Sequence, residues 1–464
     1  MAQTAFVERV FDESLAQTSY LIANLQTKEA IVIDPKRDID TYLEIARKHN
    51  FRITKVTETH IHADFLSGTR ELVSATGAEL LLSGETDSNW AYEFPHSPLK
   101  DGDKISMGEI VLTVMHTPGH TPESLTFLLM DQSVSDKPQK AFTGDFVFVG
   151  DVGRPDLLEK VAGQIGSQDK GAKSLYASLQ RFSKLPDELE IWPGHGAGSF
   201  CGKSLSSVPQ STLKIEKATN KAFQFHNDEK GFVKYILDGQ PEPPKYFAVM
   251  KQWNREPRSL LVEVPKYYEL SKEEFSEAQR NGLIIIDTRK KEVVANGYIP
   301  GSLHIEGSKS FSTFMGWLLD YEQQYVLIAD KDEIEDLTRK LMRIGMDNMY
   351  GYITDVNAQG QKLEKFSIAG RDDLLKAVGT KTKVIDVRTS SEFNTGHVKG
   401  AENIALASLE DNLAQIKTDK AIIVHCKSGT RAAMAYSILK KYGYKDVRVY
   451  LGDIKDITES PQKH

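Results

Sequence analysis

The sequence predicts an α/β protein in which an αββα sandwich is followed by two small α/β domains. Two observations lead to this fold class. In the N-terminal half, short apolar runs alternate with helical patterns and end at polar residues, which is typical of sheets covered by helices. In the C-terminal half, one motif recurs 99 residues further along, so that Ile286 is matched by Ile385 and Gly297 by Gly396. Two copies of one domain are the simplest explanation.

Apolar periodicity and turn residues place the elements and the domain boundaries. Strands are expected at residues 30–34, 53–57 and 141–145 and at several places from 104 to 130, with helices at 42–49 and near 205–235. The expected domains are residues 1–245, a linker at 246–265 that follows a Pro-rich run, and two repeats at 266–360 and 361–464.

Composition and charge narrow the classes of function. The 464 residues are 40% hydrophobic and 27% charged, a globular balance, and no apolar run reaches the length of a transmembrane helix. A net charge of -7 favours neither nucleic acid nor an anionic membrane as a partner. The N-terminus lacks the pattern of a secretory signal, and two cysteines cannot form a disulfide framework. We therefore expect a cytoplasmic protein.

Histidine and aspartate residues cluster at four places in the N-terminal half, at expected strand ends or in tight turns beside glycine. These clusters contain His60, His62, Asp64, His120, Asp145 and His195. Alternate residues of an extended segment point to the same side, so the first three side chains can converge. Imidazole and carboxylate groups together suit zinc or non-haem iron. The pattern predicts a metal site.

The order of these clusters resembles the metallo-β-lactamase superfamily over residues 1 to about 240. Within it, the chain is most similar to the persulfide dioxygenases, with the glyoxalase II thioester hydrolases as neighbours. Dinuclear members carry the motif His-x-His-x-Asp-His, and here Phe65 occupies its last position. A phenyl ring cannot bind a metal, so a single metal ion is expected.

The resemblance also implies a role for each cluster. It assigns His60, His120 and Asp145 as the ligands of one Fe(II), with zinc as the less favoured ion; this triad leaves positions open for oxygen and substrate. The remaining residues of the clusters, His62, Asp64 and His195, would surround these ligands and orient them.

Two further residues near these clusters each allow two interpretations. Arg154 lies in a Gly-Arg-Pro-Asp segment similar to one in the family. It either binds a carboxylate or phosphate of the thiol carrier or pairs with Asp156 and shapes the loop. Cys201 follows His195 by six residues. It either relays sulfur at the mouth of the metal pocket or is a buried, inert thiol.

A second site is expected where an apolar strand runs into Cys426 and a helix follows. The loop between them is Cys426-Lys427-Ser428-Gly429-Thr430-Arg431. A thiolate in such a turn faces backbone amides and a helix N-terminus, and the two cationic side chains add positive potential. Four residues separate Cys426 from Arg431, which favours a sulfur-sized group over the phosphate of the cysteine phosphatases.

Residues 370–460 closely resemble a single-domain rhodanese on the basis of this loop and of Asp386-x-Arg388. The resemblance implies that Cys426 carries a persulfide, with Lys427 and Arg431 assisting and with Ser428, Gly429 and Thr430 binding the substrate. In the first repeat, Asp330 and Glu335 stand where the cysteine and the arginine are expected. That repeat is therefore predicted to be an inactive rhodanese-like domain.

The two sites together suggest one pathway that acts on persulfides. Small thiol persulfides and dioxygen would react at the iron to give sulfite, which would take sulfur from Cys426 to form thiosulfate. The alternatives are a glyoxalase II-like thioester hydrolase and a non-catalytic persulfide carrier or sensor. The sequence leaves the thiol open among glutathione, bacillithiol, coenzyme A and cysteine, and family resemblance suggests a dimer or tetramer.

Overall fold

The computed structural model describes residues 4–86, 90–417 and 420–458. Residues 1–3 and 459–464, at the ends of the first and last predicted domains, lie outside this part. The chain forms two compact units. The first contains Met1–Pro265 together with Arg339–Gly345, and the second contains Lys266–Thr338 and Met346–His464.

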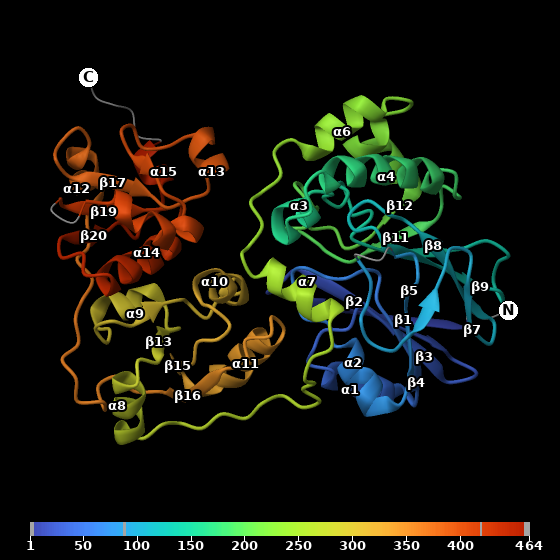
Figure 1. The fold of residues 1–464 in the computed structure, drawn as a ribbon, viewed down its shortest axis with the longest axis horizontal. Coiled ribbons are helices and arrows are strands. Elements are labelled where there is room, and N and C mark those ends of the chain that lie inside the picture. The colour runs from blue at the N-terminus through green and yellow to red at the C-terminus, as the bar shows by residue number, and fades with distance from the viewer. Residues whose placement is uncertain (1–3, 87–89, 418–419, 459–464) are drawn as a thin grey trace. The chain divides into compact units, whose positions relative to one another are not determined.

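The first unit contains two six-stranded sheets (Figure 1). The strands of one sheet, in spatial order, are β1 (Ala5–Asp12), β2 (Gln17–Asn24), β3 (Glu29–Ile33), β4 (Arg52–Thr57), β5 (Glu79–Ser83) and β6 (Ser97–Leu99). Those of the other are β12 (Ser211–Thr212), β11 (Glu190–Pro193), β10 (Lys140–Gly144), β9 (Leu125–Asp131), β8 (Ile110–His116) and β7 (Lys104–Met107). Its helices are α1 (Asp40–His49), α2 (Thr69–Thr76), α3 (Leu157–Ala162), α4 (Ser167–Phe182), α5 (Leu213–Thr219), η1 (Lys221–Gln224), α6 (Glu229–Leu237) and α7 (Phe247–Arg255).

The packing of side chains shows why this unit is an αββα sandwich. Along β2, Tyr20 and Ile22 enter the core between the sheets, where they meet side chains of β8 to β11. Their neighbours Leu21 and Ala23 point to the opposite face and pack with α1 and α2. A third core joins the other sheet to α4 and α6. Alternate side chains of β2 therefore pack against the other sheet on one side and against helices on the other. This packing confirms the predicted fold class.

The second unit contains two four-stranded parallel sheets. The first sheet has the order β14 (Leu303–His304), β13 (Ile284–Asp287), β15 (Tyr325–Ile328) and β16 (Met349–Ile353), and the second has β18 (Glu402–Asn403), β17 (Lys383–Asp386), β19 (Ile422–His425) and β20 (Val447–Val449). The helices along this part are α8 (Lys272–Arg280), α9 (Lys291–Asn296), α10 (Phe311–Leu318), η2 (Lys331–Glu333), α11 (Ile334–Met342), α12 (Arg371–Ala377), α13 (Ser390–Thr395), η3 (Leu406–Ser408), η4 (Glu410–Gln415), α14 (Thr430–Lys441) and α15 (Lys455–Thr458). Both sheets share one strand order, as the repeated motif predicts.

The interval 246–265 differs from the linker that the sequence predicts, because it contains α7, which belongs to the first unit. The buried residues of α7 are Phe247, Met250, Lys251 and Asn254. Their spacing is that of one helix face. Two of the four are polar, which hides the apolar pattern in the sequence.

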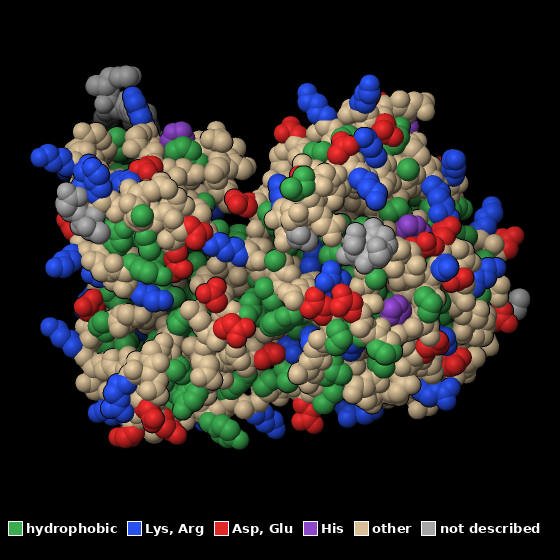
Figure 2. Space-filling model, in the orientation of Figure 1, with side chains coloured by type: hydrophobic (Ala, Val, Ile, Leu, Met, Phe, Trp, Pro, Cys, Tyr) green, Lys and Arg blue, Asp and Glu red, His purple; other side chains and the backbone are tan. Residues whose placement is uncertain are grey.

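The described residues contain no helix that is long and apolar enough to cross a membrane. On the face drawn in Figure 2, acidic and basic side chains are interspersed over the surface.

Candidate functional sites

The first candidate metal ligand follows β4, in the buried loop 58–68. Asp34 accepts hydrogen bonds from the backbone N–H and the hydroxyl of Thr59, at 2.7 and 2.9 Å. Because the hydroxyl hydrogen is used there, the Thr59 oxygen accepts from Nδ1 of His60 at 2.9 Å. The other ring nitrogen, Nε2, therefore carries a lone pair, and no described residue bonds to it.

His120 and Asp145 complete this group. The Nδ1 of His120 donates to the backbone oxygen of Arg154 at 2.9 Å, and Oδ1 of Asp145 is bonded to His195 at 2.6 Å. The remaining Asp145 oxygen, Oδ2, lies 3.7 Å from Nε2 of His60 and 3.5 Å from Nε2 of His120. All three atoms are buried and lack a hydrogen-bond partner among the described residues.

Three converging, unpaired atoms of this kind fit a metal ion. Burial lowers the pKa of His60 well below its usual value and that of His120 to about 4, so both rings are neutral and able to bind a cation. Burial opposes the charge of Asp145, yet His195 holds the pKa of this carboxyl well below its usual range. Two imidazoles and one carboxylate are the donors of a facial triad, which suits iron and also accepts zinc.

His195 lies between two carboxylates and is not positioned as a free ligand. Its Nδ1 is bonded to Asp145 and its Nε2 to Asp64, each at 2.6 Å. Although burial disfavours a charged ring, the two carboxylates raise the pKa of His195 well above its usual value. The ring therefore donates both protons and orients Asp145.

His62 is also held by a carboxylate. Its Nε2 lies 3.0 Å from Oδ1 of Asp34, and this carboxylate raises the pKa of His62 against the effect of burial. The ring of Phe65 is fully buried and lies 4.4 Å from the ring of His62, between centroids. A phenyl ring therefore occupies the position of the last His in the motif of the dinuclear members.

Cys201 lies beside this centre. Its sulfur forms a second group with Asp64 and His195, in which the potential ligand atoms all lie within 4.8 Å of one another. Burial and the carboxylates of Asp145 and Asp64 raise the pKa of the Cys201 thiol well above its usual value. The thiol is therefore buried close to the candidate metal centre and is held in the protonated, weakly nucleophilic form.

Arg154 follows the second of its two interpretations. The side chain is fully buried, and its guanidinium donates to both oxygens of Asp156 at 2.7 and 2.8 Å and to the backbone oxygen of Phe200 at 3.1 Å. With these partners satisfied, it shapes the loop and is not open to a substrate anion. The same loop supplies the Arg154 carbonyl that orients His120.

Helix α7 contributes to this centre, which the sequence does not indicate. The side-chain amide of Asn254 donates to the backbone oxygens of His62 and Phe65 at 3.0 and 2.7 Å and accepts from the backbone N–H of Ser67 at 2.9 Å. One buried amide thus ties three points of the ligand loop together. No motif marks Asn254, and the only signal in the sequence is the helical spacing of the buried residues of α7.

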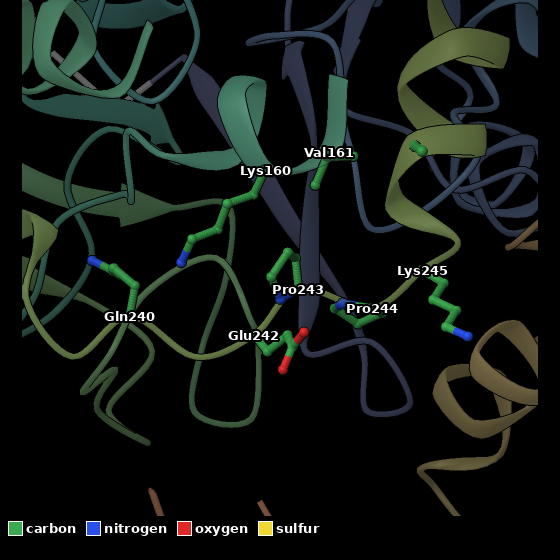
Figure 3. A pocket seen from close by; sticks show the side chains of 8 residues that line it. Lys160, Val161, Gln240, Glu242, Pro243, Pro244 and Lys245 are labelled. Atoms are coloured by element: carbon green, nitrogen blue, oxygen red, sulfur yellow. The ribbon is translucent and has the colours of Figure 1, made fainter. Parts of the chain in front are cut away.

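A separate pocket of about 650 Å³ lies between α3 and the segment that leads into α7 (Figure 3). Its described lining residues are Lys160, Val161, Gln240, Glu242, Pro243, Pro244, Lys245 and Ala248. None of them is a candidate metal ligand, so this pocket is distinct from the His and Asp centre.

In the second unit, Cys426 follows β19 directly and lies before α14, as the sequence predicts. The cysteine is buried, whereas Lys427 and Ser428 are exposed. Gly429 adopts a φ of 85°, and a Cβ atom there would lie 2.2 Å from the backbone oxygen of Leu451. Glycine is therefore required for the loop to turn at this position.

Arg431 has an acidic partner that the sequence does not indicate. Its guanidinium donates to both oxygens of Glu392 in α13, at 2.6 and 2.8 Å. Although partial burial opposes the charge, Arg431 lowers the pKa of Glu392 to about 2. An anionic substrate must therefore compete with Glu392 for this arginine.

The Asp-x-Arg motif has the same geometry in both repeats. Arg388 bonds to Asp386 and to the backbone oxygen of Gly396, and Arg289 makes the matching bonds in the first repeat. The motif therefore holds the loop after the first strand of each sheet and does not require an active cysteine. In the first repeat, the residue that directly follows β15, as Cys426 follows β19, is the buried Ala329. The exposed Asp330 therefore stands one position after the place of the cysteine that the sequence assigns to it.

Comparison with known proteins agrees with the two predicted family resemblances. Residues 14–195 match the model of the metallo-beta-lactamase superfamily, and residues 371–460 match that of the rhodanese-like domain. The crystal structure of a metallo-beta-lactamase from Staphylococcus aureus subsp. aureus COL is 41% identical, with a TM-score of 0.70. The match covers 75% of this chain and 99% of that one. The chain belongs to the metallo-β-lactamase superfamily.

Within the superfamily, two relatives correspond to the two predicted chemistries. The mitochondrial persulfide dioxygenase ETHE1 of Mus musculus is 29% identical over 225 residues, which cover 46% of this chain and 78% of that protein. A hydroxyacylglutathione hydrolase of Methylobacillus flagellatus is 25% identical over 263 residues, which cover 51% of this chain and 94% of that protein. The chain thus contains a metallo-β-lactamase domain, which has homologues among the persulfide dioxygenases, and a C-terminal rhodanese-like domain.

Proposed function

We propose that this protein oxidises low-molecular-weight thiol persulfides to sulfite at a mononuclear iron and transfers sulfane sulfur through Cys426 to give thiosulfate. In the first reaction a persulfide, dioxygen and water yield the thiol, sulfite and two protons. In the second, sulfite takes the outer sulfur of a persulfide on Cys426, and the cysteine thiol is restored. The observation that carries the proposal is the set of unpaired atoms on His60, His120 and Asp145.

The protein supplies a fixed ligand set of two neutral imidazoles and one carboxylate. Iron bound by His60, His120 and Asp145 would provide open positions at which dioxygen and the persulfide can meet. Thr59 and the Arg154 carbonyl fix the ring orientation of the two histidines. His195 holds protons on both ring nitrogens between Asp64 and Asp145 and keeps the latter ionised.

A measurement of dioxygen uptake tests the first reaction. Protein loaded anaerobically with Fe(II) receives glutathione persulfide and then dioxygen, with His120→Ala as the control. Uptake that depends on iron and is lost in the variant supports the oxygenase. Lack of uptake with glutathione persulfide and with the persulfides of cysteine, coenzyme A and bacillithiol would contradict it.

The coupling to thiosulfate is tested by product analysis of Cys426→Ser. We expect this variant to consume dioxygen at the parent rate and to accumulate sulfite, because the metal centre is unchanged. Thiosulfate formed at the parent rate would contradict the coupled scheme.

A thioester hydrolase is the second candidate, because Asp64, His195 and Cys201 form a group that could hold a second metal. In that group both nitrogens of His195 are already engaged at 2.6 Å, whereas the ligand atoms of the first group are unpaired. This contrast favours one metal and therefore the oxygenase. Hydrolysis of S-lactoylglutathione under nitrogen would support the hydrolase instead.

A further inference from the structure

Lys251 of α7 is a buried cation to which the proposed reaction assigns no role. The residue is 2% exposed. Its Nζ lies 3.4 Å from the backbone oxygen of Ile61 and 5.0 Å from the centre of the Trp90 ring. Within the described residues it forms no ion pair. An ammonium group with three donors and one long hydrogen bond is costly to bury, so a further anionic partner would stabilise it.

The position of Lys251 connects it with the metal centre. Ile61 directly follows the ligand His60. After burial and other neighbouring charges, the charge of Lys251 contributes to the lowered pKa of both His60 and His120. Burial lowers the pKa of Lys251 itself, and the carboxylate that opposes this most is Glu123.

Glu123 does not serve as the missing partner, because both of its oxygens are engaged elsewhere. One accepts from the backbone N–H of Ile61 at 2.8 Å, and the other accepts from the indole N–H of Trp90 at 2.6 Å. These hydrogen bonds hold the side chains of Glu123 and Trp90 in place beside Lys251.

The helix that carries Lys251 is held against the ligand loop at both ends. Near its start, the hydroxyl of Tyr246 donates to the backbone oxygen of Asp64 at 3.0 Å. Near its end, Asn254 bonds to His62, Phe65 and Ser67 as described above. Lys251 lies between these anchors, so its charge has a defined place at the metal centre.

We propose that Lys251 binds the ionised outer sulfur of the persulfide substrate. The inference rests on the proposed function and names the residue that recognises the charged end of the substrate. A hydrogen bond from an ammonium to an anion is among the stronger kinds, and burial increases its contribution. A neutral thioester has no negative charge at the reacting sulfur, so Lys251 would also favour persulfides over hydrolase substrates.

The test measures persulfide binding in the absence of dioxygen, where no oxidation can follow. All proteins are full-length, loaded with Fe(II) and carry Cys426→Ser, so that the second site takes up no sulfur. Lys251→Met removes the charge, Lys251→Gln keeps a donor for Ile61, and Lys251→Arg keeps the charge. Lys140→Met is the matched control, since Lys140 also lies over a tryptophan, 4.9 Å from the ring of Trp192, but is paired with Glu190.

We expect Lys251→Met and Lys251→Gln to raise the Kd for glutathione persulfide about tenfold, which is about 1.4 kcal/mol. Lys251→Arg should restore part of the affinity, and Lys140→Met should leave it unchanged. If Lys251→Met fails to fold or to retain iron, Lys251→Gln decides. Parent affinity in an iron-loaded, uncharged variant would overturn the proposal.

A second ligand separates the sulfur from the carboxylates of the carrier. The persulfide of 2-mercaptoethanol has no carboxylate, and we expect Lys251→Gln to weaken its binding by the same factor. A loss confined to glutathione persulfide would show that Lys251 binds the carrier and would overturn the inference. Anaerobic binding by the parent without later dioxygen uptake would instead contradict the proposed function alone.

Discussion

At the scale of single residues, each candidate metal ligand has a free atom because a neighbour engages the other polar atom of its side chain. Thr59 occupies one nitrogen of His60, and a backbone carbonyl occupies one nitrogen of His120. His195 occupies one oxygen of Asp145. The neighbours therefore decide which atoms face the metal, as much as the ligands do.

Substitution of Thr59 tests this arrangement. Thr59→Val has the same shape but cannot accept from Nδ1 of His60, so the ring loses the bond that fixes its tautomer. We expect the affinity for Fe(II) to fall by roughly 10- to 100-fold, measured by competition with a metal chelator. Thr59→Ser retains the hydroxyl and should bind iron as the parent does; equal losses in both variants would contradict this role.

The pair between Arg431 and Glu392 leads to a prediction about the second site. Glu392→Gln removes the competing charge, so an anionic sulfur donor should bind Arg431 more easily. We expect a several-fold lower KM for thiosulfate in sulfur transfer to cyanide, measured by thiocyanate formation. A KM that rises or is unchanged would show that Arg431 acts only as a structural partner of Glu392.

The same pair has a defined dependence on pH. Arg431 lowers the pKa of Glu392 from 4.5 to about 2 in spite of partial burial. The stabilisation from this pair is therefore complete above about pH 4.5 and is lost as the pH falls through 2. Because the pair is partly exposed, we expect it to contribute less than about 1 kcal/mol. Urea unfolding of the parent and Glu392→Gln at pH 7 and pH 3 measures the difference, which should be smaller at pH 3.

At the scale of elements, α7 is as much a part of the metal centre as the strands that end in ligands. It lies outside the matched family segment 14–195, yet its side chains bond to the ligand loop at several points. The strands bring His60 and Asp145 to one edge of the sandwich, and α7 holds the loop between them.

Substitution within α7 measures this contribution. Asn254→Ala leaves three buried backbone groups without their partner, so we expect a loss of about 2 to 3 kcal/mol in the free energy of unfolding. Gln252→Ala, on the exposed side of the same helix, should change it by less than about 0.5 kcal/mol. Denaturant unfolding of both variants measures the two free energies of unfolding. Similar losses in the two variants would contradict the role of Asn254 in holding the ligand loop.

At the scale of the whole molecule, the chain divides into two units, each with its own buried cores. The candidate metal ligands lie in the first unit and Cys426 lies in the second. The sheets of the second unit consist of their own strands, and the groups of potential metal ligands among the described residues lie in the first unit, so we expect the second unit to fold without a metal ion.

Metal removal should therefore separate the two activities. Treatment with a strong chelator is expected to abolish persulfide-dependent dioxygen uptake, whereas sulfur transfer from thiosulfate to cyanide should remain. Readdition of Fe(II) should restore uptake and serves as the control. Loss of both activities on chelation, with recovery of both, would show that the second unit depends on the metal.

Much of this organisation could be predicted from the sequence because it depends on local patterns. The repeat at Ile286 and Ile385, the loop from Cys426 to Arg431 and the order of the His and Asp clusters are all visible along the chain. The replacement of the last His of the metal-binding motif by Phe65 is also visible in the sequence. His60 follows β4 of one sheet and Asp145 follows β10 of the other, so their convergence depends on the packing of the two sheets, and only the family resemblance predicted it.

Only the tertiary structure decided the partners of each charge. The sequence left open whether Arg154 binds an anion or pairs with Asp156, and it did not indicate a partner for Arg431; in the structure Asp156 and Glu392 occupy these arginines. The burial of Lys251 beside the metal ligands also depends on a helix that is about 190 residues away along the chain. The sequence by itself determined which chemical groups are present and which elements carry them. Their pairing depends on contacts between distant segments, which local periodicity does not encode.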